Sequence, residues 1–224
     1  MPEVQRGTGA IVAGLAATLA FVLLRAVVAL GGHEPLAIDV WWHDLMVSLT
    51  SDIWVVVAWV PAVVGGTIGM IVLGAVLIAA LVWRGRRWDA ATLAIAMVAV
   101  VAIGATMAAV IGRTRPADSL AESVATSFPS GHTAVATTVV VVLALVLRRR
   151  WVWVVGIAWV LLMMWSRTYL HAHWLSDVVA GMLEGVAVAT FVWGCMEAIR
   201  ARRLASATSA SDISEEPIES TVNP

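Results

Sequence analysis

The sequence contains no lysine, so its 14 basic side chains are all arginines. Its single cysteine, Cys195, has no second cysteine with which to form an internal disulfide. Charged residues make up only 13% of the chain, whereas a soluble domain carries about 25%. The formal net charge is −1 at pH 7, so no basic excess indicates a nucleic-acid partner. These absences exclude an ordinary soluble domain and give no reason to expect nucleic-acid binding.

Apolar residues take the place of the missing charges. They make up 61% of the 224 residues, and the mean hydropathy is +0.91, which indicates an integral membrane protein. A helix needs about 20 apolar residues to cross a bilayer. Six runs approach that length, at about residues 10–30, 53–83, 88–112, 132–147, 151–165 and 174–199. We therefore expect an all-α fold, a bundle of six transmembrane helices in the cell membrane.

Two of these runs carry further information. The first is too long for the core of a signal peptide, and we interpret it as a retained helix. The second is longer than one span needs and contains Pro61, so we expect a kink near this residue. Between the two runs, Trp41, Trp42 and Leu45 are spaced as in an amphipathic helix that lies in the membrane interface.

The arginines predict how the chain is oriented. Most of them fall on one side of a six-span arrangement, at positions 6, 84–87, 148–150 and 200–203. Cytoplasmic loops are enriched in basic residues, so this side and both termini are expected to be cytoplasmic. Residues 205–224 are rich in Ser, Glu and Thr, which predicts a disordered cytoplasmic tail after one membrane domain of residues 1–204.

Three polar segments lie on the outer side, and two of them carry the arginines that fall there against this rule, Arg113, Arg115 and Arg167. The segments are GRTRP at Gly112–Pro116, PSGH at Pro129–His132, and SRTYLHAHWLSD at Ser166–Asp177. Each lies at the outer end of a predicted span. A helix bundle would therefore bring them together at one depth, on the extracytoplasmic side.

The pooled side chains suit a phosphate group. The guanidinium groups of arginines offer paired donors that match phosphate oxygens. Ser130 adds a hydroxyl group, and Gly131 allows the backbone N–H to approach an oxygen closely. A helix that begins near His132 would also direct its free N–H groups toward an anion.

The third segment supplies a candidate nucleophile. His173 and Asp177 are four residues apart and share a face of a helix. The carboxylate can orient the imidazole, which leaves the other ring nitrogen to attack phosphorus. His132 can then protonate the leaving alcohol. His171 lies off the face of Asp177, and we interpret it as interfacial or substrate-facing.

These segments resemble the type 2 phosphatidic acid phosphatase (PAP2) superfamily. The family pattern is a lysine, six residues and Arg-Pro; then Pro-Ser-Gly-His; then Ser-Arg, five residues, His, three residues and Asp. The chain matches the second and third parts in full and the end of the first part, at Arg115–Pro116, Pro129–His132, Ser166–Arg167, His173 and Asp177.

The resemblance implies a role for each matched residue. His173 would be the nucleophile that forms a phosphohistidine, Asp177 would orient it, and His132 would serve as the acid and then activate water. The phosphate would be bound by Arg115, Arg167, Ser130 and the N–H of Gly131. The resemblance implies no metal and no cofactor.

One position departs from the family pattern. The family lysine falls at Ala108, which cannot bind phosphate. Arg113, two residues before Arg115, is the residue that we expect to supply the missing charge.

The sequence thus predicts a membrane phosphatase that acts on a lipid phosphate or pyrophosphate at the outer surface. Phosphatidate, phosphatidylglycerol phosphate and polyprenyl phosphate or pyrophosphate are candidate substrates, with polyprenyl pyrophosphate favoured by family analogy alone. The main alternative is a weak or inactive lipid-phosphate binding protein, because of Ala108. A transporter that uses Glu184 fits less well, since transporter sites lie near the midplane. The related vanadate-dependent haloperoxidases are soluble, and the oligomeric state is not predicted.

Overall fold

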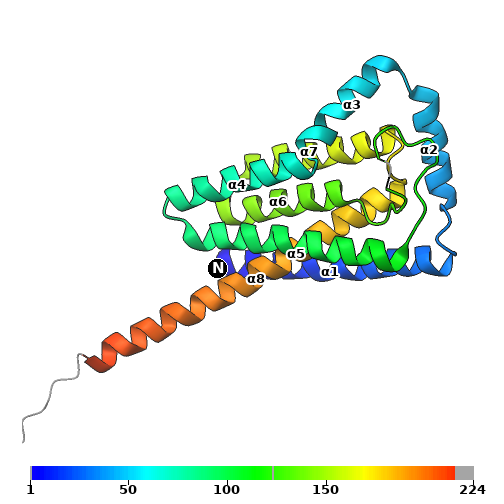
Figure 1. The fold of residues 1–224 in the computed structure, drawn as a ribbon. Helices are drawn as coiled ribbons and strands as arrows, with labels where there is room; N and C mark the ends of the chain where they lie inside the picture. Colours follow the sequence, from blue (N-terminus) through cyan, green and yellow to red (C-terminus); the bar gives the residue numbers. More distant parts are fainter. Residues whose placement is uncertain (1, 123, 215–224) are drawn as a thin grey trace, which may run out of the picture.

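The computed structural model describes residues 2–122 and 124–214, and the regular structure in this part of the chain is helical. The eight helices are α1 (Pro2–Leu30), α2 (Ala37–Leu49), α3 (Asp52–Val64), α4 (Thr67–Trp83), α5 (Arg87–Ile111), α6 (Gly131–Leu147), α7 (Arg150–Tyr169) and α8 (Leu175–Ser214) (Figure 1). Among the described residues, Thr114 and Thr126 form one isolated β-bridge. The all-α prediction is confirmed.

The helices differ in their capacity to cross a membrane. By length and composition, α1, α5, α7 and α8 each contain a sufficient apolar stretch, at Gly7–Leu30, Arg87–Ile111, Arg150–Tyr169 and Leu175–Ser206. Helices α3 and α4 give a fifth candidate if they are taken as one broken span, and α6 is apolar but has only 17 residues. The described residues therefore contain four or five candidate spans, and the sixth, at α6, stays a prediction.

The long second run bends, but not at the predicted residue. Pro61 lies inside α3, whereas the chain breaks at Gly65 and Gly66 with an angle of 49° between α3 and α4. Two consecutive glycines are poor helix formers. A Cβ atom at Gly65 would also lie 2.1 Å from Cε of Met163. The break therefore falls where α7 packs closely against the chain.

Two predictions outside the main runs have different outcomes. The interfacial segment does form a helix, α2, whose Trp42 packs beside Met46 and Tyr169 near the end of α7. The disordered tail was predicted from residue 205, but α8 continues as a helix to Ser214. Alanines at and after the end of the apolar run favour this continuation. Residues 215–224 lie outside the described residues.

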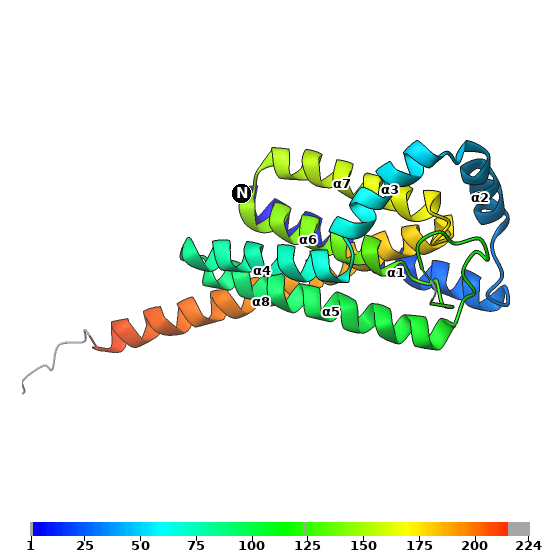
Figure 2. The ribbon, with the colours of Figure 1, turned by 45° about the horizontal axis from the view of Figure 1, so that its top comes forward.

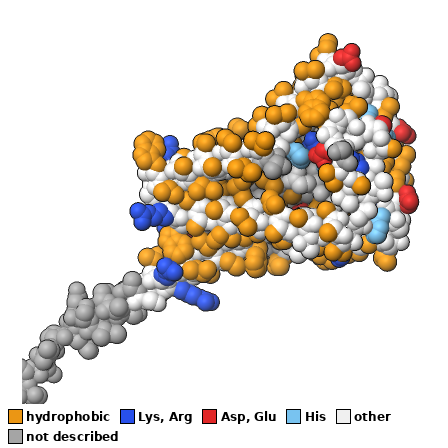
Figure 3. All heavy atoms as spheres, in the orientation of Figure 1, with side chains coloured by type: hydrophobic (Ala, Val, Ile, Leu, Met, Phe, Trp, Pro, Cys, Tyr) orange, Lys and Arg blue, Asp and Glu red, His pale blue; other side chains and the backbone are white. Residues whose placement is uncertain are grey.

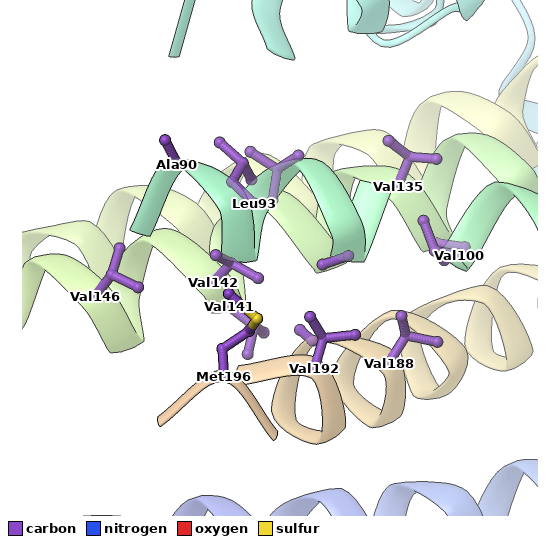
Figure 4. Close-up of a cluster of buried hydrophobic side chains, with 14 of the residues drawn as sticks. Ala90, Leu93, Val100, Val135, Val141, Val142, Val146, Val188, Val192 and Met196 are labelled. Carbon is purple, nitrogen blue, oxygen red and sulfur yellow. The ribbon is translucent and has the colours of Figure 1, made fainter. Parts of the chain in front are cut away.

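The core of the bundle forms around α6. Helix α7 lies on one side of α6, and α4 and α5 lie on the other (Figure 2). Apolar side chains from α5, α6 and α8, including Leu93, Val142 and Val188, fill the space between these helices (Figure 4). Glycines in α8 allow a close approach to α6, since a Cβ atom at Gly181 would lie 2.4 Å from the carbonyl oxygen of Ser130.

The two ends of the bundle carry different side chains. Helix α1 begins and α8 leaves the bundle at one end, whereas α2, the 112–130 segment and the α7–α8 junction meet at the other (Figure 1). Exposed arginines gather at the first end, and acidic and histidine side chains gather at the second (Figure 3). All three polar segments of the sequence lie at this second end.

Candidate active site

The three polar segments converge where α5 ends and where α6 and α8 begin. Gly112 ends α5 in a left-handed conformation, with φ of 60°. This conformation favours glycine, and it turns the chain back toward the bundle. The following segment reaches α6 at Gly131, while α7 leads through residues 170–174 into α8.

A single carboxylate marks the point of convergence. Nη2 of Arg115 lies 2.9 Å from Oε2 of Glu122, and Nη2 of Arg167 pairs with Oε1 of the same carboxylate. Nδ1 of His132 lies 3.7 Å from Oε1. One residue from each predicted segment therefore contacts Glu122, at the site that the sequence predicted for a phosphate.

The charge of Glu122 reflects these neighbours. Burial by itself raises the pKa of its carboxyl group. The positive groups around it, Arg167 first and then His173, Arg115 and His132, outweigh burial and hold the pKa below its ordinary value. The carboxylate is therefore ionised at neutral pH, and it lies among positive groups that favour an anion.

The two arginines are held in different ways. Nε of Arg115 donates to the carbonyl of Val124 at 2.9 Å and Nη2 to that of Thr126 at 2.7 Å, while Nη1 bonds to the carbonyl of Ala172. Arg115 thus fastens the 112–130 segment to the α7–α8 junction. Arg167 is only 1% exposed, and its Nε has no hydrogen-bond partner among the described residues. It offers a buried donor to an incoming oxygen.

His173 is oriented by a backbone carbonyl as well as by Asp177. Its Nδ1 lies 2.8 Å from the carbonyl oxygen of Ser127 and 3.8 Å from Oδ2 of Asp177. The first distance is that of a hydrogen bond, whereas the second is too long for one. With Nδ1 as the donor, Nε2 keeps its lone pair. Burial lowers the pKa of His173, which favours the neutral, nucleophilic form.

The beginning of α6 lies against the beginning of α8. The N–H of Ser130 donates to the carbonyl of Asp177 at 3.0 Å, and the buried Ser130 hydroxyl accepts from Thr133 Oγ1 at 3.2 Å. Gly131 is the first residue of α6, so its N–H has no acceptor within the helix. Such N–H groups at a helix start favour an anion.

Comparison with known proteins identifies the family. The model of the PAP2 superfamily matches residues 89–201 of the chain. The chain belongs to the PAP2 superfamily. This match includes all three polar segments, α6 and α7 in full, and the parts of α5 and α8 next to these segments.

Two relatives extend the comparison. The chain is 34% identical over 112 residues to an undecaprenyl-diphosphatase of Sulfolobus acidocaldarius, an alignment that covers 47% of this chain and 54% of that protein. The match thus spans about half the length of this curated relative. The structure is similar to that of a transmembrane PAP2 type phosphatidylglycerolphosphate phosphatase from Bacillus subtilis, with a TM-score of 0.72 over 83% of this chain and 96% of the other. At 22% identity, this second likeness supports the fold alone.

Within this candidate site, Arg113 does not occupy the position that the sequence suggested. It was expected to replace the family lysine at Ala108, but its side chain has no exposed surface and its Nη atoms pair with Asp39 and Asp177. A guanidinium enclosed by two carboxylates has satisfied its charge away from the pocket. The remaining predicted residues, Arg115, Arg167, Ser130, Gly131, His132, His173 and Asp177, do lie around the site.

The PAP2 pattern missed three residues of this neighbourhood. Glu122 lies in the polar 112–130 segment without any periodic or motif signal, and Ser127 contributes only its carbonyl. Asp39 lies in α2, and an acidic residue in an interfacial helix gives no signal in the sequence. A fully buried aspartate in an otherwise interfacial helix would have been a signal, but burial is known only from the fold.

Two residues that the sequence left open lie outside this PAP2 site. Nδ1 of His171 lies 2.9 Å from Asp118, and its ring is stacked edge-on against His43. Glu184 is 2% exposed in α8, and its carboxylate oxygens have no hydrogen-bond partner among the described residues. Neither side chain contacts Glu122 or Arg115 in the ion pairs of the site.

Proposed function

We propose that the chain is a membrane phosphatase that hydrolyses a lipid phosphate or diphosphate at the outer membrane surface. The observation that carries this proposal is the convergence of Arg115, Arg167 and His132 on one carboxylate, with His173 oriented nearby. Two guanidinium groups that share one anion form a site whose geometry suits phosphate oxygens. The 34% identity over 112 residues to an undecaprenyl-diphosphatase supports a lipid substrate.

The geometry supports a two-step reaction. In the first step, Nε2 of His173 attacks phosphorus, the N–P bond forms, and the P–O bond to the lipid breaks as the leaving oxygen takes a proton from His132. In the second step, water attacks the phosphohistidine, His132 accepts its proton, and the N–P bond breaks to release phosphate. Arg115, Arg167 and the N–H of Gly131 stabilise the charge that develops on the phosphoryl oxygens.

Substrate binding requires that Glu122 move. Both of its oxygens are paired with arginines, so a phosphate cannot pair with the same guanidinium groups until the carboxylate leaves. Part of the Glu122 side chain is exposed, at 24%, and it belongs to a segment between helices rather than to a helix. The site is therefore self-paired through Glu122, and a substrate phosphate would replace one anion by another.

The expected orientation follows from the arginines. The site lies at the end of the bundle opposite the exposed arginine clusters (Figure 3). Since cytoplasmic loops carry the basic residues, this arrangement supports a site on the extracytoplasmic side. His132 lies near the break between α3 and α4, because a Cβ atom at Gly66 would be 3.7 Å from its Nε2. A lipid tail would enter from the membrane beside this break.

The decisive experiment measures phosphate release by the purified full chain in detergent micelles. The panel contains phosphatidate, phosphatidylglycerolphosphate, and polyprenyl monophosphate and diphosphate. We expect release from at least one lipid, and no release by His173→Ala. His33→Asn is the control, because His33 has a left-handed φ of 67° outside the site and asparagine tolerates that conformation.

A second measurement tests the mechanism. Acid-labile phosphate trapped on the wild-type chain by rapid quenching, and absent from His173→Ala, would establish the phosphohistidine. A folded wild-type chain that binds these lipids but releases no phosphate would instead support the binding-protein alternative raised by Ala108.

A further inference from the structure

A buried ionic network lies behind the proposed nucleophile. Nη2 of Arg113 donates to Oδ2 of Asp39 at 2.7 Å, and Nη1 donates to Oδ1 of Asp177 at 2.6 Å. None of these three side chains has any exposed surface. They come from α2, from the second residue after α5 and from the first turn of α8. The network therefore joins three parts of the chain and reaches His173 through Asp177, whose Oδ2 lies 3.8 Å from Nδ1 of His173.

Both carboxylate oxygens of Asp39 are occupied. Oδ1 accepts the N–H of Ser176 at 2.7 Å, and Oδ2 accepts the Ser176 hydroxyl at 2.7 Å and the N–H of Leu36 at 3.0 Å, besides Arg113. The first N–H groups of a helix have no partner within it. A carboxylate from α2 thus caps the first turn of α8, one residue before Asp177.

We propose that Asp39 and Arg113 are positioning residues that hold Asp177 in register with the His173 imidazole. Arg113 occupies Oδ1 of Asp177, while Oδ2 accepts the N–H of Trp174 at 2.9 Å and lies 3.8 Å from Nδ1 of His173. A carboxylate fixed through both oxygens cannot rotate freely about its side-chain torsions. The effect on catalysis that this inference predicts rests on the proposed role of His173 as the nucleophile.

The network also sets the charge next to the imidazole. Neither Asp39 nor Arg113 contacts His173, so each acts through Asp177. Without the Arg113 cation, the Asp177 carboxylate would stabilise the imidazolium more strongly; without the Asp39 anion, Arg113 would offset Asp177 more completely. The other charged or titratable groups that interact with His173 are Arg115, Arg167, Glu122 and His132, and these stay unchanged in the variants below.

A histidine titration by NMR tests the inference without any substrate. The full chain is labelled on its histidine rings in detergent, and the signal lost in His173→Gln is followed. We expect Arg113→Gln to raise the pKa of His173 and Asp39→Asn to lower it, each by roughly one pH unit. A general loosening of the fold would move both variants in the same direction, so opposite signs identify the network.

The control variant removes one partner of an arginine–aspartate ion pair at the other end of the bundle. Nε of Arg86 lies 2.5 Å from Oδ2 of Asp89, and Asp89 is 8% exposed. Asp89→Asn removes this partner without approaching the site, and it should leave the His173 titration unchanged.

Kinetics on the preferred lipid complete the test. Asp39→Asn and Arg113→Lys should lower kcat by about tenfold or more and change KM by less than about twofold, because neither residue contacts the substrate. Lysine keeps the charge but cannot bond both carboxylates in the same geometry, so Arg113→Lys should lower kcat while the pKa of His173 stays close to that of the wild type.

The two proposals fail in different ways. The positioning inference is overturned if folded Asp39→Asn keeps the wild-type titration and the wild-type kcat. If Arg113→Gln does not fold, the His173 titration and the kcat of Asp39→Asn and Arg113→Lys test the inference instead. If the titrations shift as expected but the wild-type chain releases no phosphate from any lipid, the proposed function is wrong and the network inference stands.

Discussion

Arginines at the two ends of the bundle differ in exposure and in partners. At the end where α8 leaves the bundle, Arg84 and Arg149 are exposed. At the opposite end, Arg113, Arg115 and Arg167 are 0%, 8% and 1% exposed, and each pairs with a carboxylate. Because a buried guanidinium is costly unless it is paired, only the second group is committed to specific contacts. The first group underlies the proposed orientation, and two members of the second group, Arg115 and Arg167, belong to the proposed phosphate site.

Substitution of one arginine at each end should show the largest difference in kcat between the two groups. Arg167→Gln removes a donor that faces the proposed phosphate, and removal of one such donor costs about 10² to 10³ in kcat. Arg149→Gln removes an exposed charge at the other end and should change kcat by less than about twofold. Steady-state phosphate release by both variants, with circular dichroism as a check on folding, measures the difference. Equal losses in two folded variants would contradict the distinction between the ends.

The sequence predicted the family and the all-α class better than the details of the fold. Apolar runs report helices because a bilayer leaves the backbone few other ways to satisfy its hydrogen bonds. They do not report where a long run breaks. Pro61 was the local signal, but the break at Gly65 depends on the approach of Met163 from α7. The continuation of α8 past residue 205 was not predicted either, because the polar composition of this part resembles that of a disordered tail.

At the site, too, contacts between distant segments could not be predicted from the sequence. His173 and Asp177 were recognisable because both lie within one segment, at a spacing that a helix makes meaningful. Arg113 was misplaced, because its partner Asp39 lies 74 residues earlier in the chain and no spacing rule connects them. Glu122 was missed because an acidic residue in a polar segment carries no pattern. Motifs report which residues share a role, whereas ion pairing between distant segments is decided by packing.

The contacts of Glu122 with Arg115 and Arg167 give a second test of the difference between the two ends of the bundle, with a smaller expected effect. Glu122→Gln removes the anion that competes with the substrate, so we expect the inhibition constant of orthovanadate to fall about tenfold, or about 1.4 kcal/mol. Because the positive neighbours hold the pKa of Glu122 below its ordinary value, the carboxylate competes at neutral and mildly acidic pH. As the pH falls through that lowered pKa, wild type loses this charge and the two proteins should converge.

The matched control for Glu122 lies at the other end of the bundle. Glu197 and Arg200 are 3.7 Å apart, with side chains that are 37% and 47% exposed. Exposed pairs contribute little, so Glu197→Gln should leave vanadate inhibition unchanged. Weaker inhibition of Glu122→Gln than of wild type would show that the carboxylate assists anion binding rather than opposing it.

The last prediction compares two glycines of α8. Gly181 lies near the start of the helix, beside α6, and Gly194 lies farther along it. A Cβ atom at Gly181 would lie 2.4 Å from the carbonyl oxygen of Ser130, whereas one at Gly194 would meet no atom within 4 Å. Backbone atoms cannot yield as a flexible side chain can, so Gly181→Ala should destabilise the protein by about 1–3 kcal/mol. Gly194→Ala removes a poor helix former without a clash and should be neutral or stabilising by up to about 1 kcal/mol. Thermal unfolding in detergent distinguishes the signs. If both substitutions raised the Tm, the contact between α6 and α8 could not be as close as the structure has it, and Ser130 would lie farther from Asp177 than the site requires.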